Sequence, residues 1–363
     1  MMAQSIGPAY QRTSRHKENT MPLGSFRLNG LARSISVEDV FDPFVILIKT
    51  DNPGDSNNNQ ITLPLTGTYT IDWGDGVEEE LTDTQTHTYS SAGTYQIKIK
   101  GALTRIEARL GGDQLKFLEI QNWGDPVWTT FQNAYLNCNN IIITATDAPD
   151  LSLGPSFRFA FGNCTSFTNP QISHWNMSAV TTYREIFSGC INFNSNINDW
   201  AATPSGSLFN AFANCQNYNQ PMDKWFQTTT PFTGDMRGFL AACHQFNQPV
   251  NMWNVKPSRL QQTFASCFNF NQPVSNWDTS NCANFRGMFS TASSFNQPLL
   301  RDGDKWNTER MTNGIDMFRN ATSFNQDLSG WCVPLQTDQP GGFDTNTPAW
   351  NKTNRLPLWG TCP

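Results

Sequence analysis

The chain has 363 residues, of which 38% are hydrophobic, 12% aromatic and only 15% charged, and its formal net charge is −6. The negative charge argues against a nucleic-acid-binding surface. The longest apolar run, residues 44–48, is much too short to insert into a membrane as a helix.

Changes in composition divide the chain into an N-terminal arm (1–40), a small β domain (41–102), a repeat region (103–331) and a C-terminal cap (332–363). The low share of charged residues and the abundance of Asn, Thr, Ser and aromatic residues predict a mainly β protein.

Residues 1–40 are expected to form an arm rather than a domain, because proline and glycine interrupt them. Their first nineteen residues carry no apolar segment, so no signal peptide is expected. The stretch MPLGSFRLNGLAR, residues 21–33, resembles the opening of structural proteins from marine tailed phages. That resemblance implies an arm held by other virion proteins, and a disordered tail is the alternative.

Six short runs in residues 41–102 predict β-strands. The runs are residues 44–49, 61–63, 68–72, 77–81, 86–89 and 94–100. Gly74-Asp75-Gly76 lies between two of them and predicts a tight hairpin turn, because glycine adopts the positive φ that such a turn needs.

Three motifs follow one another in this segment: Ile71-Asp72-Trp73-Gly74-Asp75-Gly76, His87-Thr88-Tyr89 and Ala92-Gly93-Thr94-Tyr95. In this order they resemble the polycystic-kidney-disease-type (PKD) domain, which implies an immunoglobulin-like β-sandwich that acts as a spacer or adhesion module. The carboxylates of Asp72 and Asp75 offer ligands to a cation, but turn-capping hydrogen bonds are the preferred interpretation.

A repeat of 24 to 29 residues organises the rest of the chain. Its tryptophans are Trp175, Trp200, Trp225, Trp253, Trp277, Trp306 and Trp331. Each repeat also has one position that holds a small residue, and we call this position the slot. The slot residues are Cys138, Cys164, Cys190, Cys215, Cys243, Cys267, Ala292 and Ala321. Aromatic residues lie three positions before and after most slots, so the cysteines are expected to be buried free thiols. A period of this length is typical of a solenoid.

The pattern F-N-Q-P, three residues, W follows the slot in several repeats, as in Phe270–Trp277. It resembles the BspA-like leucine-rich-repeat surface proteins over residues 103–363. The resemblance implies a right-handed solenoid with short strands along one face and helical or irregular turns on the other. Counted from Cys138, the slots predict about eight coils. The asparagines are expected to bond the backbone of the neighbouring coil. The tryptophans either pack between coils or stack on a partner's sugar rings.

Two longer intervals between tryptophans predict surface loops suited to recognition. Their candidate recognition residues are Phe232, Asp235, Arg301, Asp302, Asp304 and Lys305. Outside the slots, Cys332 and Cys362 flank the final segment and are a candidate disulfide, whereas Cys282 matches neither set.

No arrangement of residues predicts catalysis, a metal site or a cofactor. The histidines His16, His87, His174 and His244 lie apart from cysteines or carboxylates at metal-ligand spacing. No nucleophile elbow, phosphate loop or dinucleotide motif is present. The informative residues recur in every repeat, whereas a catalytic group occurs once in a unique environment. Such recurrence fits an extended binding face better than an active site, so we do not expect an enzyme.

Three functions remain. The favoured one is a non-enzymatic virion structural protein of a tailed phage, a capsid decoration, fibre or spike that presents the solenoid for attachment to a host surface protein or glycan. It would be multicopy or homo-oligomeric, with its arm on other virion proteins. The alternatives are a bacterial cell-surface adhesin of the BspA-like type and a carbohydrate-active enzyme on a solenoid.

Overall fold

All six strands predicted between residues 41 and 102 are present, with ends shifted by a few residues. The computed structural model describes residues 41–168, 170–200, 206–300 and 305–363, so the predicted arm lies outside the described residues. The strands are β1 (Phe44–Lys49), β2 (Gln60–Leu63), β3 (Leu65–Asp72), β4 (Glu78–Thr82), β5 (Gln85–Thr88) and β6 (Thr94–Ile106). Over the described residues the protein is mainly β with almost no helix.

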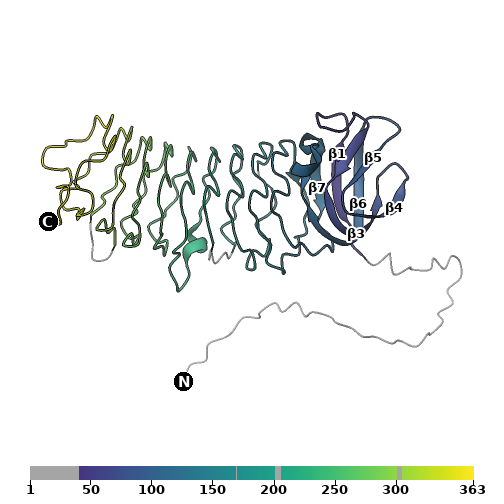
Figure 1. Ribbon diagram of the computed structural model, residues 1–363, viewed down its shortest axis with the longest axis horizontal. Helices are drawn as coiled ribbons and strands as arrows, with labels where there is room; N and C mark the ends of the chain where they lie inside the picture. The colour runs from purple at the N-terminus through teal and green to yellow at the C-terminus, as the bar shows by residue number, and fades with distance from the viewer. Residues whose placement is uncertain (1–40, 169, 201–205, 301–304) are drawn as a thin grey trace, which may run out of the picture. The chain divides into compact units, whose positions relative to one another are not determined.

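The main sheet connects this segment to the repeats (Figure 1). Its order is β4-β3-β6-β1-β7-β8, where β7 is Phe117–Asn122 and β8 is Ile142–Ile143, while β2 pairs with β5 alone. Neighbouring strands are antiparallel except β7 and β8, which are parallel. A parallel pair separated by about one repeat is what successive turns in one direction produce. At β7 the sheet therefore changes from antiparallel pairing of strands to the parallel pairing of successive repeats.

The β3–β4 turn contacts the His87-Thr88-Tyr89 motif, and Tyr95 of the third motif stacks on Tyr89 with centroids 3.6 Å apart. Gly74 and Gly76 have φ of 80° and 92°, and the Trp73 amide donates to the Val77 carbonyl at 3.0 Å. The Trp73 ring stacks on His87 with centroids 4.4 Å apart, and Tyr89 Oη donates to the Trp73 carbonyl.

The two carboxylates of this turn hold the turn itself. Asp72 Oδ1 accepts from the Gly74 amide at 2.9 Å, and Asp75 Oδ1 accepts from the Val77 amide at 3.1 Å. The second Asp75 oxygen lies 2.9 Å from His87 Nε2. The turn-capping interpretation of Asp72 and Asp75 is confirmed.

A buried ion pair, not predicted from the sequence, lies between β6 and β7. Two short 3-10 helices, η2 (Ala108–Gly111) and η3 (Gln114–Lys116), lie there. Asp113 is the N-cap of η3 and Lys116 is its last residue, and both side chains are 0% exposed. Lys116 Nζ lies 3.6 Å from Asp113 and donates to the carbonyls of Ser56, Asn57 and Gln60. Asp113 in turn accepts from the amides of Ser56 and Thr62. The pair thereby ties the loop before β2 to the main sheet.

The repeats beyond β8 are built from turns that bond to the next repeat. Amides of one repeat donate to carbonyls of the following one: Phe157 to Thr182, Phe159 to Arg184, Phe161 to Ile186 and Asn163 to Ser188. Figure 1 shows these turns side by side from teal to yellow. Isolated parallel bridges replace the short strands that the family resemblance implies. The one helix described here is a 3-10 turn, η4 (Asp223–Phe226).

Positive backbone φ explains the scarcity of strands in the repeats. The residue five positions before the slot and the residue just before it are left-handed in each repeat, as are Gln262 (57°) and Ser266 (57°) before Cys267. A left-handed residue reverses the chain and interrupts any extended run. The same pair continues before Thr347 as Gly342 and Asn346, so the repeat geometry extends into the predicted cap.

Aromatic rings form the interior of the repeats. All seven repeat tryptophans are at most 2% exposed, so the sugar-stacking interpretation is wrong and packing between repeats is confirmed. Phe264 stacks on Phe289, and Trp253 on Trp277, with centroids 5.9 and 5.6 Å apart. Four indoles also donate to a carbonyl of the preceding repeat, as Trp277 Nε1 does to Val250 at 2.9 Å.

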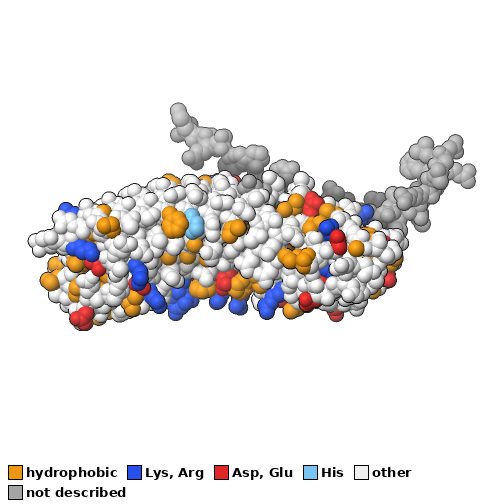
Figure 2. Space-filling view, turned by 90° about the horizontal axis from the view of Figure 1, so that it is seen from above, with side chains coloured by type: hydrophobic (Ala, Val, Ile, Leu, Met, Phe, Trp, Pro, Cys, Tyr) orange, Lys and Arg blue, Asp and Glu red, His pale blue; other side chains and the backbone are white. Residues whose placement is uncertain are grey.

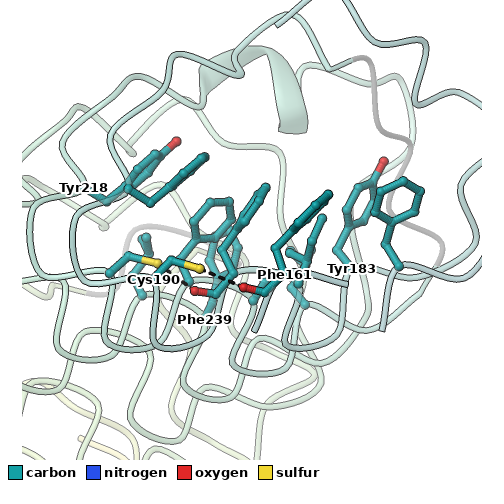
Figure 3. Packing of buried hydrophobic residues seen from close by; sticks show 14 of the residues in the cluster. Phe161, Tyr183, Cys190, Tyr218 and Phe239 are labelled. Carbon is teal, nitrogen blue, oxygen red and sulfur yellow. Dashed lines mark hydrogen bonds between the residues drawn. The ribbon is translucent and has the colours of Figure 1, made fainter. Parts of the chain in front are cut away.

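The slot cysteines are buried free thiols, as predicted. Each thiol from Cys164 to Cys267 donates to the carbonyl three residues before the preceding slot; Cys190 reaches Phe161 at 2.9 Å (Figure 3). Each of these carbonyls also accepts from the backbone amide of the preceding slot residue, as Phe161 does from Cys164, so the thiol is a second donor that links the two repeats. This hydrogen bond is a reason beyond size for cysteine in the slot. Cys282 is also free and buried.

Asparagine side chains line one edge of the repeats, also as predicted. Asn247 Oδ1 accepts from the backbone amide of Asn271, whose own Oδ1 accepts from the amide of Asn296, both at 2.9 Å. The same bond continues to Asn325 and Asn351. Each asparagine therefore satisfies a corner amide of the following repeat.

Candidate functional site

The structure places Phe232 in the interior. Its ring is 4% exposed and packs edge-on against Phe226, and its backbone bonds the next repeat through Asn254 and Lys256. The prediction that Phe232 is presented on a recognition loop does not fit this position. Proline and glycine around it make the segment resemble a loop, but inter-repeat bonds hold it.

Asp235 lies at the surface and orients two arginines. Its carboxylate accepts from Arg237 Nε at 2.9 Å and Nη2 at 2.6 Å, and Arg259 Nη1 lies 3.9 Å away. The hydrogen bond with Asp235 raises the pKa of Arg237. Asp235 therefore orients the guanidinium groups of Arg237 and Arg259.

The second candidate loop, residues 301–305, makes no contact with Asp235 among the described residues. Lys305 is exposed and its Nζ donates to Asn276 Oδ1 at 3.2 Å, whereas Arg301, Asp302 and Asp304 lie outside the described residues.

The candidate pair Cys332 and Cys362 is joined by a disulfide with a sequence separation of 30. Glu309 lies beside it, so that one oxygen and the two sulfurs are within 4.8 Å of one another. Because both sulfurs are bonded, they offer no thiolate to a metal ion.

An arginine row crosses the repeats six positions before the slot. Its members in successive repeats are Arg158, Arg184, Phe209, Arg237, Gln261 and Arg286. The guanidinium carbons of Arg184 and Arg237 both lie 4.7 Å from the centroid of the Phe209 ring, which belongs to the repeat between them. Figure 2 shows basic side chains gathered along one edge of the repeats. Sequence reasoning missed this row because Phe209 and Gln261 interrupt it.

Side-chain caps set the geometry of the arginine row. Two residues before five of the six members stands a side chain that accepts from that member's amide, as Thr182 does from Arg184 and Asn284 does from Arg286. Such a cap holds the local turn that carries the row residue. Arg259 occupies this capping position before Gln261 and adds a further positive charge.

A polar groove of about 400 Å³ lies on the arginine row. Its lining includes Phe209, Arg237, Gln261, Asn284, Arg286 and Asn313. These residues come from five successive repeats, so the groove runs along the direction of stacking.

The histidines of the described part do not form a catalytic arrangement with one another. His174 Nε2 lies 3.0 Å from the Asp147 carbonyl, His87 contacts Asp75, and His244 stacks on Phe268 with centroids 4.3 Å apart. His16 lies outside the described residues.

The free thiols should resist alkylation in the folded protein and lower its stability at alkaline pH. Burial raises the pKa of Cys138, Cys164, Cys215, Cys243 and Cys267, and it raises the pKa of Cys282 to about 12. Since only the unfolded chain loses these protons above about pH 8.5, this contribution should be complete below that pH and fall as the pH rises toward 12.

Two measurements check this expectation. Mass spectrometry after iodoacetamide treatment at pH 8 should find the seven free cysteines unmodified, and modified after unfolding. Urea midpoints between pH 7 and pH 10.5 should decline less for Cys267→Ala than for the unaltered protein. Alkylation of a slot cysteine in the native protein would contradict the burial of these thiols.

One protein family matches the chain: the one described as "Mycoplasma protein of unknown function, DUF285" matches residues 155–259 and 234–354. These ranges include the arginine row, the slot cysteines from Cys164 onward and the asparagine edge. The match is consistent with the resemblance to BspA-like repeats. No curated protein and no solved structure matches the chain. None of the described helices has the length and hydropathy of a membrane span.

Proposed function

The chain belongs to the family described as Mycoplasma protein of unknown function, DUF285, and from this premise we propose that it is a non-enzymatic attachment protein. Its repeats present a binding face to a host surface protein or glycan. The protein is a structural component of a tailed-phage virion, present in several copies and anchored by residues 1–40.

The observation that carries the proposal is the contrast between interior and surface in the repeats. The tryptophans, thiols and asparagine bonds recur with little change and serve packing, whereas the arginine row and its groove vary from repeat to repeat on the outside. A scaffold that holds a variable, extended face suits binding better than catalysis, which needs one unique cluster.

The proposal includes a finer description of the two described regions. Residues 41–102 act as a PKD-like spacer, supported by the convergence of Trp73, His87 and Tyr89 on the β3–β4 turn. The repeats form a right-handed solenoid of the leucine-rich-repeat type, supported by backbone bonds that pass from each repeat to the next. The virion location draws on the resemblance of residues 21–33 to phage structural proteins.

A labelling experiment tests the location and the role separately. Gold-coupled antibodies raised against the full chain should decorate purified virions in electron micrographs. Fluorescently labelled full chain should bind intact host cells and compete with virion adsorption. Undecorated virions would refute the location, and absence of cell binding would refute attachment.

The second candidate is a bacterial cell-surface adhesin, which family membership favours. In that case the antibodies should label bacterial cells grown without phage. Because both candidates bind through the repeats, the location of the antibody label distinguishes them.

A further inference from the structure

The groove on the arginine row is rich in hydrogen-bond donors, and the Asp235 carboxylate that binds Arg237 is not part of its lining. Its lining holds two arginines and several side-chain amides but no carboxylate. Arg286 has no ion-pair partner within the described part of the chain, and Arg237 keeps its guanidinium beside the groove through Asp235.

The amides of the groove are oriented as donors. Asn284 Oδ1 accepts from the Arg286 amide and Asn313 Oδ1 from the Ile315 amide, each at 3.1 Å. With their oxygens engaged, the two Nδ2 groups remain, and neither has an acceptor among the described residues. The groove thus offers guanidinium and amide N–H groups together, a set that matches an acceptor-rich anion.

The shape of the groove favours a polymer. Lining residues from five repeats, at roughly 4.8 Å a repeat, extend over about 20 Å. The volume of about 400 Å³ is within the range of ligand sites, and the row continues past the groove to Arg184 and Arg158.

The aromatic ring at the groove does not suit stacking. Phe209 already carries the guanidinium groups of Arg184 and Arg237. This arrangement leaves little ring surface for a neutral sugar or a nucleic-acid base, both of which bind proteins largely by stacking.

We propose that this groove binds an acidic polysaccharide, with carboxylate or sulfate groups held by Arg237 and Arg286 and sugar hydroxyls by Asn284 and Asn313. The inference rests on the proposed attachment function and names its ligand class. A charged glycan chain lying along the stack would contact several repeats at once, so modest contacts add to a usable affinity.

The test is calorimetric titration of the full chain with polygalacturonate as the carboxylated probe. Heparin serves as the sulfated probe and methyl-esterified polygalacturonate as the uncharged one. Arg286→Gln should weaken binding about tenfold, because one charge-assisted contact is lost. Arg109→Gln, an exposed arginine on η2 that removes the same charge, should weaken it less than about twofold.

Each outcome decides the inference. Tighter binding of polygalacturonate or of heparin identifies the anionic group. Absence of binding to both, equal binding of the esterified polymer, equal loss in the two variants, or tighter binding of single-stranded DNA would overturn it. Host-cell binding that survives Arg286→Gln while acidic polysaccharide fails to bind would overturn this inference alone and leave attachment standing. Circular dichroism of both variants verifies folding.

Discussion

Replacing Trp277 with alanine should lower the free energy of unfolding by about 3–5 kcal/mol. The ring is 0% exposed, stacks on Trp253 at 5.6 Å and contacts Phe264 at 5.7 Å. Its Nε1 donates to the Val250 carbonyl at 2.9 Å. Alanine would leave a cavity against Trp253 and Phe264. It would also remove one of the two donors to the Val250 carbonyl, which would keep only the Trp253 amide.

Urea unfolding followed by circular dichroism measures the effect. Trp277→Phe keeps a ring but loses the hydrogen bond, so it should cost less than alanine. Met252→Ala is a nearby control, since Met252 is 75% exposed and its loss should change stability by no more than about 0.5 kcal/mol. A loss below about 1 kcal/mol for Trp277→Ala would show that the repeats do not share a packed interior.

Replacing Lys116 with methionine should also cost about 3–5 kcal/mol, because it leaves a buried carboxylate without its cation. Asp113 is fully buried, and the carbonyls of Ser56, Asn57 and Gln60 would each lose the Lys116 ammonium as a donor. The first consequence should be release of the loop before β2, seen as faster amide hydrogen exchange there.

Two variants control for this effect. Lys49→Met removes a partner of Asp51 in an exposed pair and should cost at most about 1 kcal/mol. Adding Asp113→Asn to Lys116→Met removes the unpaired charge and should recover part of the loss. Additive losses in the double variant would argue that the two side chains do not interact.

Periodicity made the interior predictable. Positions such as Cys190, Trp225 and Asn271 recur at a constant offset, and a side chain repeated in every unit must occupy the same environment in each. The six strands of residues 44–106 were predictable for a similar reason, because short apolar runs between turn residues describe a sheet segment directly.

The features that sequence reasoning missed depend on tertiary contacts. The left-handed positions are occupied by residues as different as Phe159, Glu185, Gln262 and Gly287, so no single residue type reveals them. Only the frequency of Gly and Asn there gives a signal. Lys116 and Asp113 are separated by two residues and look like ordinary surface charges, because the carbonyls that surround Lys116 come from a distant loop.

The asparagine edge has a consequence for how such proteins can change in evolution. The two hydrogen bonds of Asn271 at this edge both join it to neighbouring repeats. Its backbone amide donates to Asn247 Oδ1, and its own Oδ1 accepts from the backbone amide of Asn296. Every unit thus presents to its successor the same acceptor that it took from its predecessor. A duplication or deletion of one whole unit would leave each junction with equivalent partners, so recombination can lengthen or shorten the chain while the sheet at one end and the disulfide-closed segment at the other stay intact.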